Sequence, residues 1–346
     1  MAAATPHTLN LALQGGGSHG ALTWGVLDAL LEDDGLVFEG IRGTSAGAMN
    51  AVVLAHGFAQ AAAQEKKPAD ALHLGRDLAR QALRELWEGV GTMGTMGNIL
   101  WGVPLPGVPI MGVLNQFLSP YQTNPLNINP LRQLLTRVVD FDTLVHPENA
   151  AVVPKLFVCA TNVRTGRGKI FTGEQVTADA IMASACLPQM FKAVEIDGEH
   201  YWDGGFSGNP ALYPLLYETK SRDILLVQIN PKESDKLPDS ASEIMDRMNE
   251  VTFNAGLLAE LRAIEFVVRM LEQKRLDSDR YKHVLMHRID GGEVLKPFGA
   301  SSKARADITL VRELFSLGRE RAQEWLHRNR EHLGVRQTLR FNDNMV

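Results

Sequence analysis

The sequence predicts an α/β protein whose first strands are parallel. Residues 8–13 form an apolar run that ends in a glycine-rich loop, and a helical pattern over 21–31 follows. A second apolar run over 38–44 leads through another short turn into a small-residue helical pattern over 46–55. Residues 223–228 are apolar on both faces, which is typical of a strand covered by helices on both sides. Strands joined through a helix in this way pack in parallel with a right-handed crossover.

The middle of the chain departs from this alternation. Helical patterns over 70–87 and 126–139 flank residues 89–122, which are rich in Gly, Met and Pro and match neither a strand nor a helix for long. We expect 57–148 to be an inserted helical and apolar cap. Residues 89–122 could be an acyl-chain pocket, a lid, a surface that dips into lipid or an irregular cap packed on the core. The sequence leaves these alternatives open.

The α/β pattern resumes after the insert, and we expect one domain over residues 1–346. A short helix is expected over 178–185, a long amphipathic helix or helix pair over 240–275, and a helical tail over 309–332. Residues 235–346 are expected to form a C-terminal helical extension that contains one strand, over 283–288. The remaining strands are expected over 155–161, 169–171, 193–196, 200–202 and 223–228.

Composition excludes several protein classes. The 346 residues are 45% hydrophobic and 22% charged, which is typical of a globular protein, and a net charge of −5 without a long Lys/Arg run argues against nucleic-acid binding. Two cysteines, Cys159 and Cys186, can complete neither a disulfide framework nor a four-ligand zinc site. The N-terminal apolar run is too short for a signal peptide, and no stretch reaches 18 apolar residues. We therefore expect a cytoplasmic protein that holds no metal and whose membrane contact, if any, is peripheral.

The first glycine motif, at 15–20, follows a predicted strand and precedes a predicted helix. Backbone N–H groups converge in such a loop and the helix start adds a positive end, so the loop predicts an anion site. The anion could be a dinucleotide pyrophosphate, because Gly15, Gly17 and Gly20 satisfy G-x-G-x-x-G. It could equally be the oxyanion of a tetrahedral acyl intermediate. An ordinary glycine turn is the third alternative.

The second glycine motif favours acyl transfer. Gly43-Thr44-Ser45-Ala46-Gly47 is G-x-S-x-G between a predicted strand and a predicted helix, which is the pattern of a nucleophile elbow. A simple helix N-cap serine is the alternative. Dinucleotide binding also expects an acid near the end of the second strand, whereas Glu39 lies at that strand's beginning. Ser45 is therefore the candidate nucleophile.

A serine nucleophile needs a base to take its proton. Asp203 lies in Tyr201-Trp202-Asp203-Gly204-Gly205, at a predicted strand end where aromatic neighbours can raise the pKa of a carboxyl group. An aspartate in a plain Asp-Gly turn is the alternative. The downstream histidines fit no recognisable loop motif and are expected to be structural or exposed; they are His283, His287, His327 and His332.

The three motifs, in this order, resemble those of the patatin-like phospholipases. The glycine loop at 15–20, the elbow at 43–47 and the Asp-Gly-Gly at 203–205 match in order and type. The stretch 183–188, Ala-Ser-Ala-Cys-Leu-Pro, resembles the family's A-S-x-x-x-P segment, and 161–166 is also similar. The resemblance covers roughly residues 8–215.

The resemblance implies a three-layer α/β/α sandwich around a mostly parallel central sheet. It implies a lipid acyl hydrolase of phospholipase A or lysophospholipase type that works through a Ser-Asp dyad, with Ser45 as nucleophile and Asp203 as base, and without metal or cofactor. Its substrate would be a phospholipid or another lipid ester. The implied supporting residues are the oxyanion loop Gly15, Gly16, Gly17 and Ser18, the elbow glycines Gly43 and Gly47, and the neighbours His19, Gly204 and Gly205.

One position departs from the family pattern, which has Arg or Lys where this chain has His19. The imidazole could lose a fixed positive charge, supply a pH-dependent one, assist Ser45 or simply pack. Two rival functions stay open at this point, a nucleotide-dependent oxidoreductase and a non-enzymatic lipid-binding module with a relict site.

Overall fold

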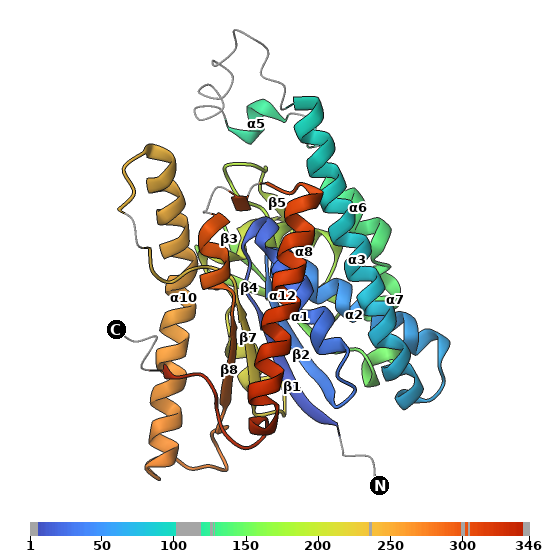
Figure 1. Cartoon of the computed structure of the whole chain (residues 1–346), viewed down its shortest axis with the longest axis vertical. Helices are drawn as coiled ribbons and strands as arrows, with labels where there is room; N and C mark the ends of the chain where they lie inside the picture. Colours follow the sequence, from blue (N-terminus) through green and yellow to red (C-terminus); the bar gives the residue numbers. More distant parts are fainter. Residues whose placement is uncertain are drawn as a thin grey trace.

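The computed structural model describes residues 6–101, 119–124, 127, 129–234, 237–298, 302–303 and 305–341. An eight-stranded sheet lies at its centre, in the order β5-β6-β3-β2-β1-β7-β8, with β4 paired to β3 (Figure 1). The strands are β1 (His7–Leu13), β2 (Leu36–Thr44), β3 (Lys155–Asn162), β4 (Gly168–Phe171), β5 (Val194–Ile196), β6 (Glu199–Asp203), β7 (Asp223–Gln228) and β8 (Leu285–Asp290).

The sheet is mostly parallel. β3, β2, β1, β7 and β8 run in one direction, while β4 and β6 are antiparallel to β3, and β5 is antiparallel to β6. The chain proceeds from β1 to β2 and β3 on one side, and β7 and β8 lie on the other side of β1. In open α/β sheets, ligands bind beyond the carboxyl ends of the strands at such a reversal. The reversal at β1 therefore marks the end of the sheet where a site is expected.

Helices cover both faces of the sheet, which confirms the three-layer prediction. Leu11 and Leu13 of β1 face one apolar core, shared with α1, α2, α3 and α12, whereas Ala12 faces a second core, shared with α9 and α10. The helices are α1 (Gly20–Leu31), α2 (Ala46–Gln64), α3 (Pro68–Trp101), α5 (Pro120–Thr123), α6 (Pro130–Val138), α7 (Phe141–Val145), α8 (Ala178–Ser184), α9 (Tyr213–Tyr217), α10 (Ala241–Glu272), α11 (Gly292–Leu295) and α12 (Ile308–Asn329).

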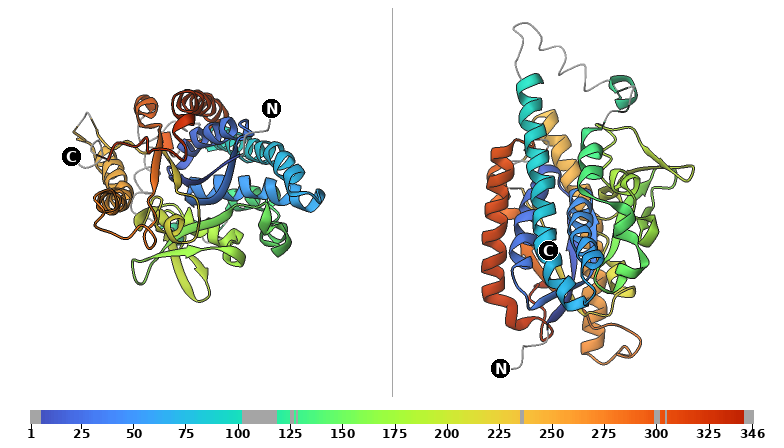
Figure 2. Two further views of the ribbon diagram at one scale, coloured as in Figure 1. Left: turned by 90° about the horizontal axis from the view of Figure 1, so that it is seen from below. Right: turned by 90° about the vertical axis from the view of Figure 1, so that its right-hand side faces the viewer.

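The expectation of irregular structure from residue 89 onward is wrong for 89–101. Helix α3 continues to Trp101 and rises past the end of the sheet (Figure 2). Its glycines disfavour a helix in isolation, but they allow close packing, since a Cβ on Gly91 would lie 2.8 Å from Ile308 Cδ1. Leu83 and Leu86 of α3 are fully buried in the main core. Residues 102–118, which make up half of the segment 89–122, lie outside the described residues.

Within the described part of the chain, no helix is long and apolar enough to cross a membrane. The predicted strand at 283–288 is β8, shifted by two residues, and the expected helix or helix pair over 240–275 is the single helix α10. Helix α2 extends to Gln64, so the insert expected at 57 begins within a helix rather than after it.

Candidate active site

Ser45 lies at the tip of the turn between β2 and α2. Its backbone has φ 54° and ψ −123°, a conformation that non-glycine residues rarely adopt. The turn closes tightly because Gly47 has no side chain: a Cβ there would overlap the Leu13 carbonyl of the neighbouring strand. Such strain is found mainly at functional positions, and here it places the serine before the first turn of α2.

The elbow is held from outside by Ser184, the last residue of α8. The Ser45 N–H donates a 2.9 Å hydrogen bond to the Ser184 hydroxyl, and Ser184 is fully buried. In the sequence, Ser184 stands out only as part of the segment 183–188, which indicates no role for it. Its contact to Ser45 is long-range, so no local pattern could have revealed it.

Strand register brings Asp203 to Ser45. Strand β2 pairs with β3 up to Thr44, opposite Cys159, and β6 pairs with β3 from Ala160, opposite Asp203. β4 lies along the other edge of β3 at these same residues, so β2 and β6 must share one edge. The end of β6 therefore meets the end of β2 head to head. This arrangement places a carboxylate directly beside the elbow.

Asp203 is fully buried, and within the described part of the chain only one of its two oxygens has a hydrogen-bond partner. Oδ1 accepts a 2.7 Å hydrogen bond from the Gly205 N–H, whereas no described residue lies in hydrogen-bonding geometry to Oδ2. Burial raises the pKa of the carboxyl to about 7, against the lowering effects of the Gly205 N–H and the Ser45 hydroxyl. The Ser45 hydroxyl thus interacts with the carboxyl without forming a full hydrogen bond, as is common for catalytic pairs before substrate binds.

The glycine loop packs directly on the elbow. A Cβ on Gly15 would lie 2.5 Å from the Thr44 carbonyl oxygen and 2.7 Å from Ser45 Cβ, so only glycine permits this approach. The Gly15 N–H already donates a 2.6 Å hydrogen bond to Asn209 Oδ1. Gly15 therefore supports the loop, and its N–H group is already engaged by Asn209.

The next three backbone N–H groups are available. Among the described residues, those of Gly16, Gly17 and Ser18 donate no hydrogen bond. Gly17 has a left-handed φ of 59°, and the residues that follow form a single short turn. Available N–H groups in a loop that packs on the serine turn are the expected arrangement of a candidate oxyanion hole.

Side-chain amides that sequence reasoning missed fix the loop. Asn209 follows the Asp203–Gly205 turn, and its Nδ2 donates to the Gly15 carbonyl at 3.1 Å. Asn230, just beyond β7, donates to the same carbonyl at 2.6 Å. Gln14 Oε1 accepts from the N–H groups of Ile229 and Asn230. These contacts join the base turn, the glycine loop and the end of β7 into one unit.

His19 is neutral and buried. Its Nε2 lies 2.6 Å from the Ser302 hydroxyl, and burial, with a smaller effect of Lys303, lowers the pKa of the imidazole to about 3. The side chain therefore supplies neither a fixed nor a pH-dependent positive charge near neutrality. His287, the best buried of the other predicted histidines, is bonded to Asp223 at the start of β7. That contact lies at the opposite end of the sheet from Ser45.

The residues needed for dinucleotide or metal chemistry are not assembled in the described part of the chain. Glu39 lies in the first half of β2, and its carboxylate accepts the N–H groups of Lys220 and Ser221 at 2.8 and 2.7 Å. It is therefore at the wrong end of the strand for a ribose. No group of three or more potential metal ligands occurs among the described residues. Both cysteines are free and buried, and burial raises the pKa of Cys186 to about 12.

Comparison with known proteins identifies the family. A family model for patatin-like phospholipases matches residues 11–216. Among solved structures, VipD from Legionella pneumophila matches with 16% identity, a TM-score of 0.35 and coverage of 90% of this chain and 67% of that one. The complex of full-length SpcU with full-length ExoU from the type III secretion system of Pseudomonas aeruginosa matches with 16% identity, a TM-score of 0.29 and coverage of 92% and 54%. The chain thus spans about half the length of that second protein. No curated protein sequence matches this chain.

With more than half of its residues matched by the family model, the chain belongs to the patatin-like phospholipase family. At the level of the family, it is a lipid acyl hydrolase.

Proposed function

We propose that the protein hydrolyses carboxylic esters of phospholipids or lysophospholipids through a dyad of Ser45 and Asp203. The observation that carries this proposal is the meeting of β2 and β6 on one edge of β3, which sets the elbow serine against a buried carboxylate with a free oxygen. The N–H groups of Gly16, Gly17 and Ser18, which donate to no residue in the described ranges, supply the remaining component of an acyl-transfer site.

In the first half of the reaction, the Ser45 hydroxyl attacks the ester carbonyl and passes its proton to Asp203 Oδ2. The negative charge that develops on the carbonyl oxygen is stabilised by the N–H groups of Gly16, Gly17 and Ser18. Collapse of the tetrahedral intermediate expels the alcohol part of the lipid, which takes the proton from Asp203. The acyl group is then esterified to Ser45.

In the second half, Asp203 takes a proton from water, and the resulting hydroxide attacks the acyl-enzyme. The same N–H groups stabilise the second intermediate, and its collapse releases the fatty acid and returns the proton to Ser45. A carboxyl with a pKa of about 7 suits both directions of proton transfer near neutral pH.

The proposed reaction predicts the isotopic composition of the product. We expect folded wild-type protein to release free fatty acid from phosphatidylcholine or lysophosphatidylcholine micelles, and in water enriched in the heavy oxygen isotope each acid should carry one labelled oxygen. Mass spectrometry of the extracted lipids measures this. Acyl transfer to a second alcohol without label would instead show a transacylase. No release from any ester would favour a lipid-binding module without turnover.

We also propose that the site end of α10 contacts the lipid surface. Four exposed apolar side chains lie there at helical spacing, with Met248 58% and Val251 53% exposed, and Ile244 and Met245 beside them. The same turn of the helix reaches the site, because a Cβ on Gly205 would lie 2.9 Å from the Phe253 ring. A row of exposed apolar side chains on a surface helix is typical of peripheral lipid contact.

Replacing Met248 and Val251 together by Asp should lower hydrolysis of phospholipid vesicles by about tenfold or more, because both side chains would lose their apolar burial in lipid. Hydrolysis of a soluble short-chain ester should stay within twofold of wild type. Phe266→Asp is the matched control, since Phe266 is also 53% exposed and lies toward the other end of α10. Equal losses on vesicles for both variants would contradict a contact localised at the site end.

A further inference from the structure

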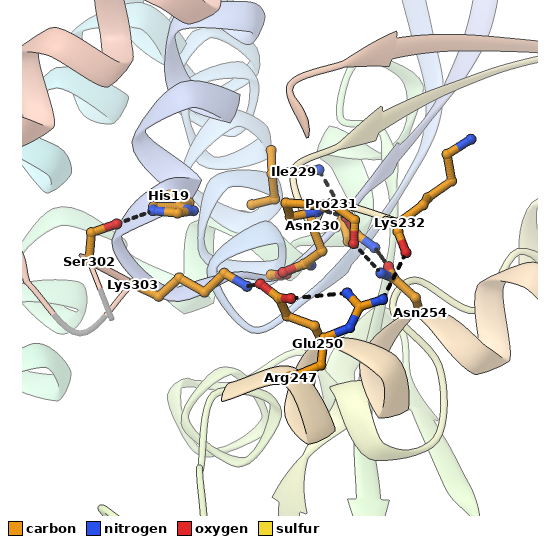
Figure 3. A network of polar contacts seen from close by, with 12 residues as sticks. His19, Ile229, Asn230, Pro231, Lys232, Arg247, Glu250, Asn254, Ser302 and Lys303 are labelled. Atoms are coloured by element: carbon orange, nitrogen blue, oxygen red, sulfur yellow. Dashed lines mark hydrogen bonds and ion pairs between the residues drawn. The ribbon is translucent and has the colours of Figure 1, made fainter. Parts of the chain in front are cut away.

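Two residues from the C-terminal part of the chain lie on the glycine loop. The Ser18 hydroxyl donates a 2.7 Å hydrogen bond to the Ser302 carbonyl. The Ser302 hydroxyl lies 2.6 Å from His19 Nε2, and Figure 3 shows this second contact. Ser302 is 4% exposed, so both contacts are shielded from water. Both side chains of the loop segment 15–20 therefore bind one residue that is nearly three hundred positions away along the chain.

Lys303 continues this contact through its backbone. A Cβ on Gly17 would overlap the Lys303 carbonyl oxygen, and Gly17 has the left-handed φ of 59°. Only glycine combines this conformation with this approach. The Lys303 backbone thus lies against the middle one of the three candidate oxyanion donors.

The Lys303 side chain is fixed on α10. Its Nζ lies 3.2 Å from Glu250 Oε1, and Arg247 Nη1 lies 3.3 Å from the other oxygen of the same carboxylate. The two charged groups of the Lys303–Glu250 pair are only 20% and 12% exposed, so water screens them less than a surface pair. Figure 3 shows the side chain running from the segment beside His19 toward Glu250.

We propose that Ser302 and Lys303, named here the strap, are positioning residues that hold the N–H groups of Gly16, Gly17 and Ser18 in the geometry that binds the oxyanion. The strap touches no reacting atom. Both residues lie outside the region 11–216 that the family model covers, so the strap belongs to the C-terminal part of this chain. The inference rests on the proposed function, because it concerns the oxyanion donors of that reaction.

The physical need for such a restraint follows from the loop itself. Three successive glycines give a flexible backbone, and the three N–H groups donate no hydrogen bond to any residue that the structure describes. Oxyanion donors act because they are preorganised, and the loss of one costs about 10²–10³ in kcat. Loosening the loop should therefore slow the acylation step without weakening ground-state binding of the substrate.

Ser302→Ala, compared with Ser302→Thr, tests the strap with a soluble short-chain ester. We expect Ser302→Ala to lower kcat by about 10- to 100-fold with KM within twofold. Ser302→Thr keeps a hydroxyl for His19 and should retain most of kcat. The pH midpoint of activity should stay at the wild-type value in both, because Asp203 is not touched. Glu250→Gln, which removes the negative charge that pairs with Lys303, should lower kcat by a smaller factor. This variant provides the test if Ser302→Ala does not fold.

The outcomes separate this proposal from the function on which it rests. If wild type turns over the ester and both folded variants, Ser302→Ala and Glu250→Gln, have the same kcat as wild type, the strap proposal alone is overturned. Equal loss in Ser302→Ala and Ser302→Thr, with a matching fall in melting temperature, would show a merely structural contact and would also overturn it. Absence of turnover by wild type would overturn the proposed function and the strap together.

Discussion

Ser45→Ala is expected to lower kcat for ester hydrolysis by about 10⁴-fold or more, because nucleophile loss in serine hydrolases leaves only binding and oxyanion stabilisation. The variant should fold, since the elbow is held by the Ser45 N–H bond to Ser184, which alanine retains. Steady-state rates on a soluble ester and thermal melts measured by circular dichroism check both statements.

Ser316→Ala is the matched control for the serine substitution. Ser316 lies on the exposed face of α12, where its hydroxyl donates a hydrogen bond to the Arg312 carbonyl of the same helix. We expect wild-type kcat from this control. If folded Ser45→Ala keeps more than about one tenth of the wild-type kcat, Ser45 is not the nucleophile, because loss of a catalytic nucleophile lowers kcat by far more than tenfold.

Asp203→Asn is expected to lower kcat by about 10³-fold or more and to remove the main pH dependence of the reaction. The wild-type carboxyl has a pKa of about 7 because it is buried, and only its ionised form can take the serine proton. Wild-type kcat/KM should therefore rise as the pH rises through about 7. The amide has no such transition, so the residual activity of the variant should lack this rise.

The same carboxyl has a predictable effect on stability. Its pKa is higher in the folded protein than in the unfolded chain, so the folded state binds the proton more tightly and loses stability as the pH rises toward 7. Asp203→Asn removes this loss. The melting temperature of the variant relative to wild type should thus increase from about pH 5 to about pH 8.

Asp142→Asn, on the exposed side of α7, is the matched control for both measurements and should change neither profile. An unchanged pH–rate profile in Asp203→Asn would contradict the assignment of Asp203 as the base. A constant difference in melting temperature between the variant and wild type would contradict its raised pKa.

Sequence reasoning reached the parallel sheet and the two glycine motifs because these depend on local pattern. Glycine spacing and short apolar runs fix a turn within a few residues, so the ends of β1 and β2 could be placed. The helical course of α3 past residue 89 was missed, because Gly91 is favoured there by its contact with Ile308 rather than by propensity.

The parts of the site that were missed depend on contacts between distant segments. β6 pairs with the edge of β3 from the residue after the one where β2 stops pairing. This register cannot be predicted from the sequence of either strand. Asn209, Ser184 and Ser302 are single polar residues in turns or at helix ends. Such residues are common there because their side chains hydrogen-bond the nearby backbone. Only the fold shows that they bind the glycine loop and the elbow.

The most direct test of the dyad is the reaction of the protein with a fluorophosphonate ester, followed by peptide mass spectrometry. The geometry predicts one adduct, on the peptide that contains Ser45, and a labelling rate that falls by about 100-fold or more in Asp203→Asn, because the hydroxyl loses its proton acceptor. An adduct on another residue, or equal labelling rates in wild type and Asp203→Asn, would contradict the Ser45–Asp203 mechanism.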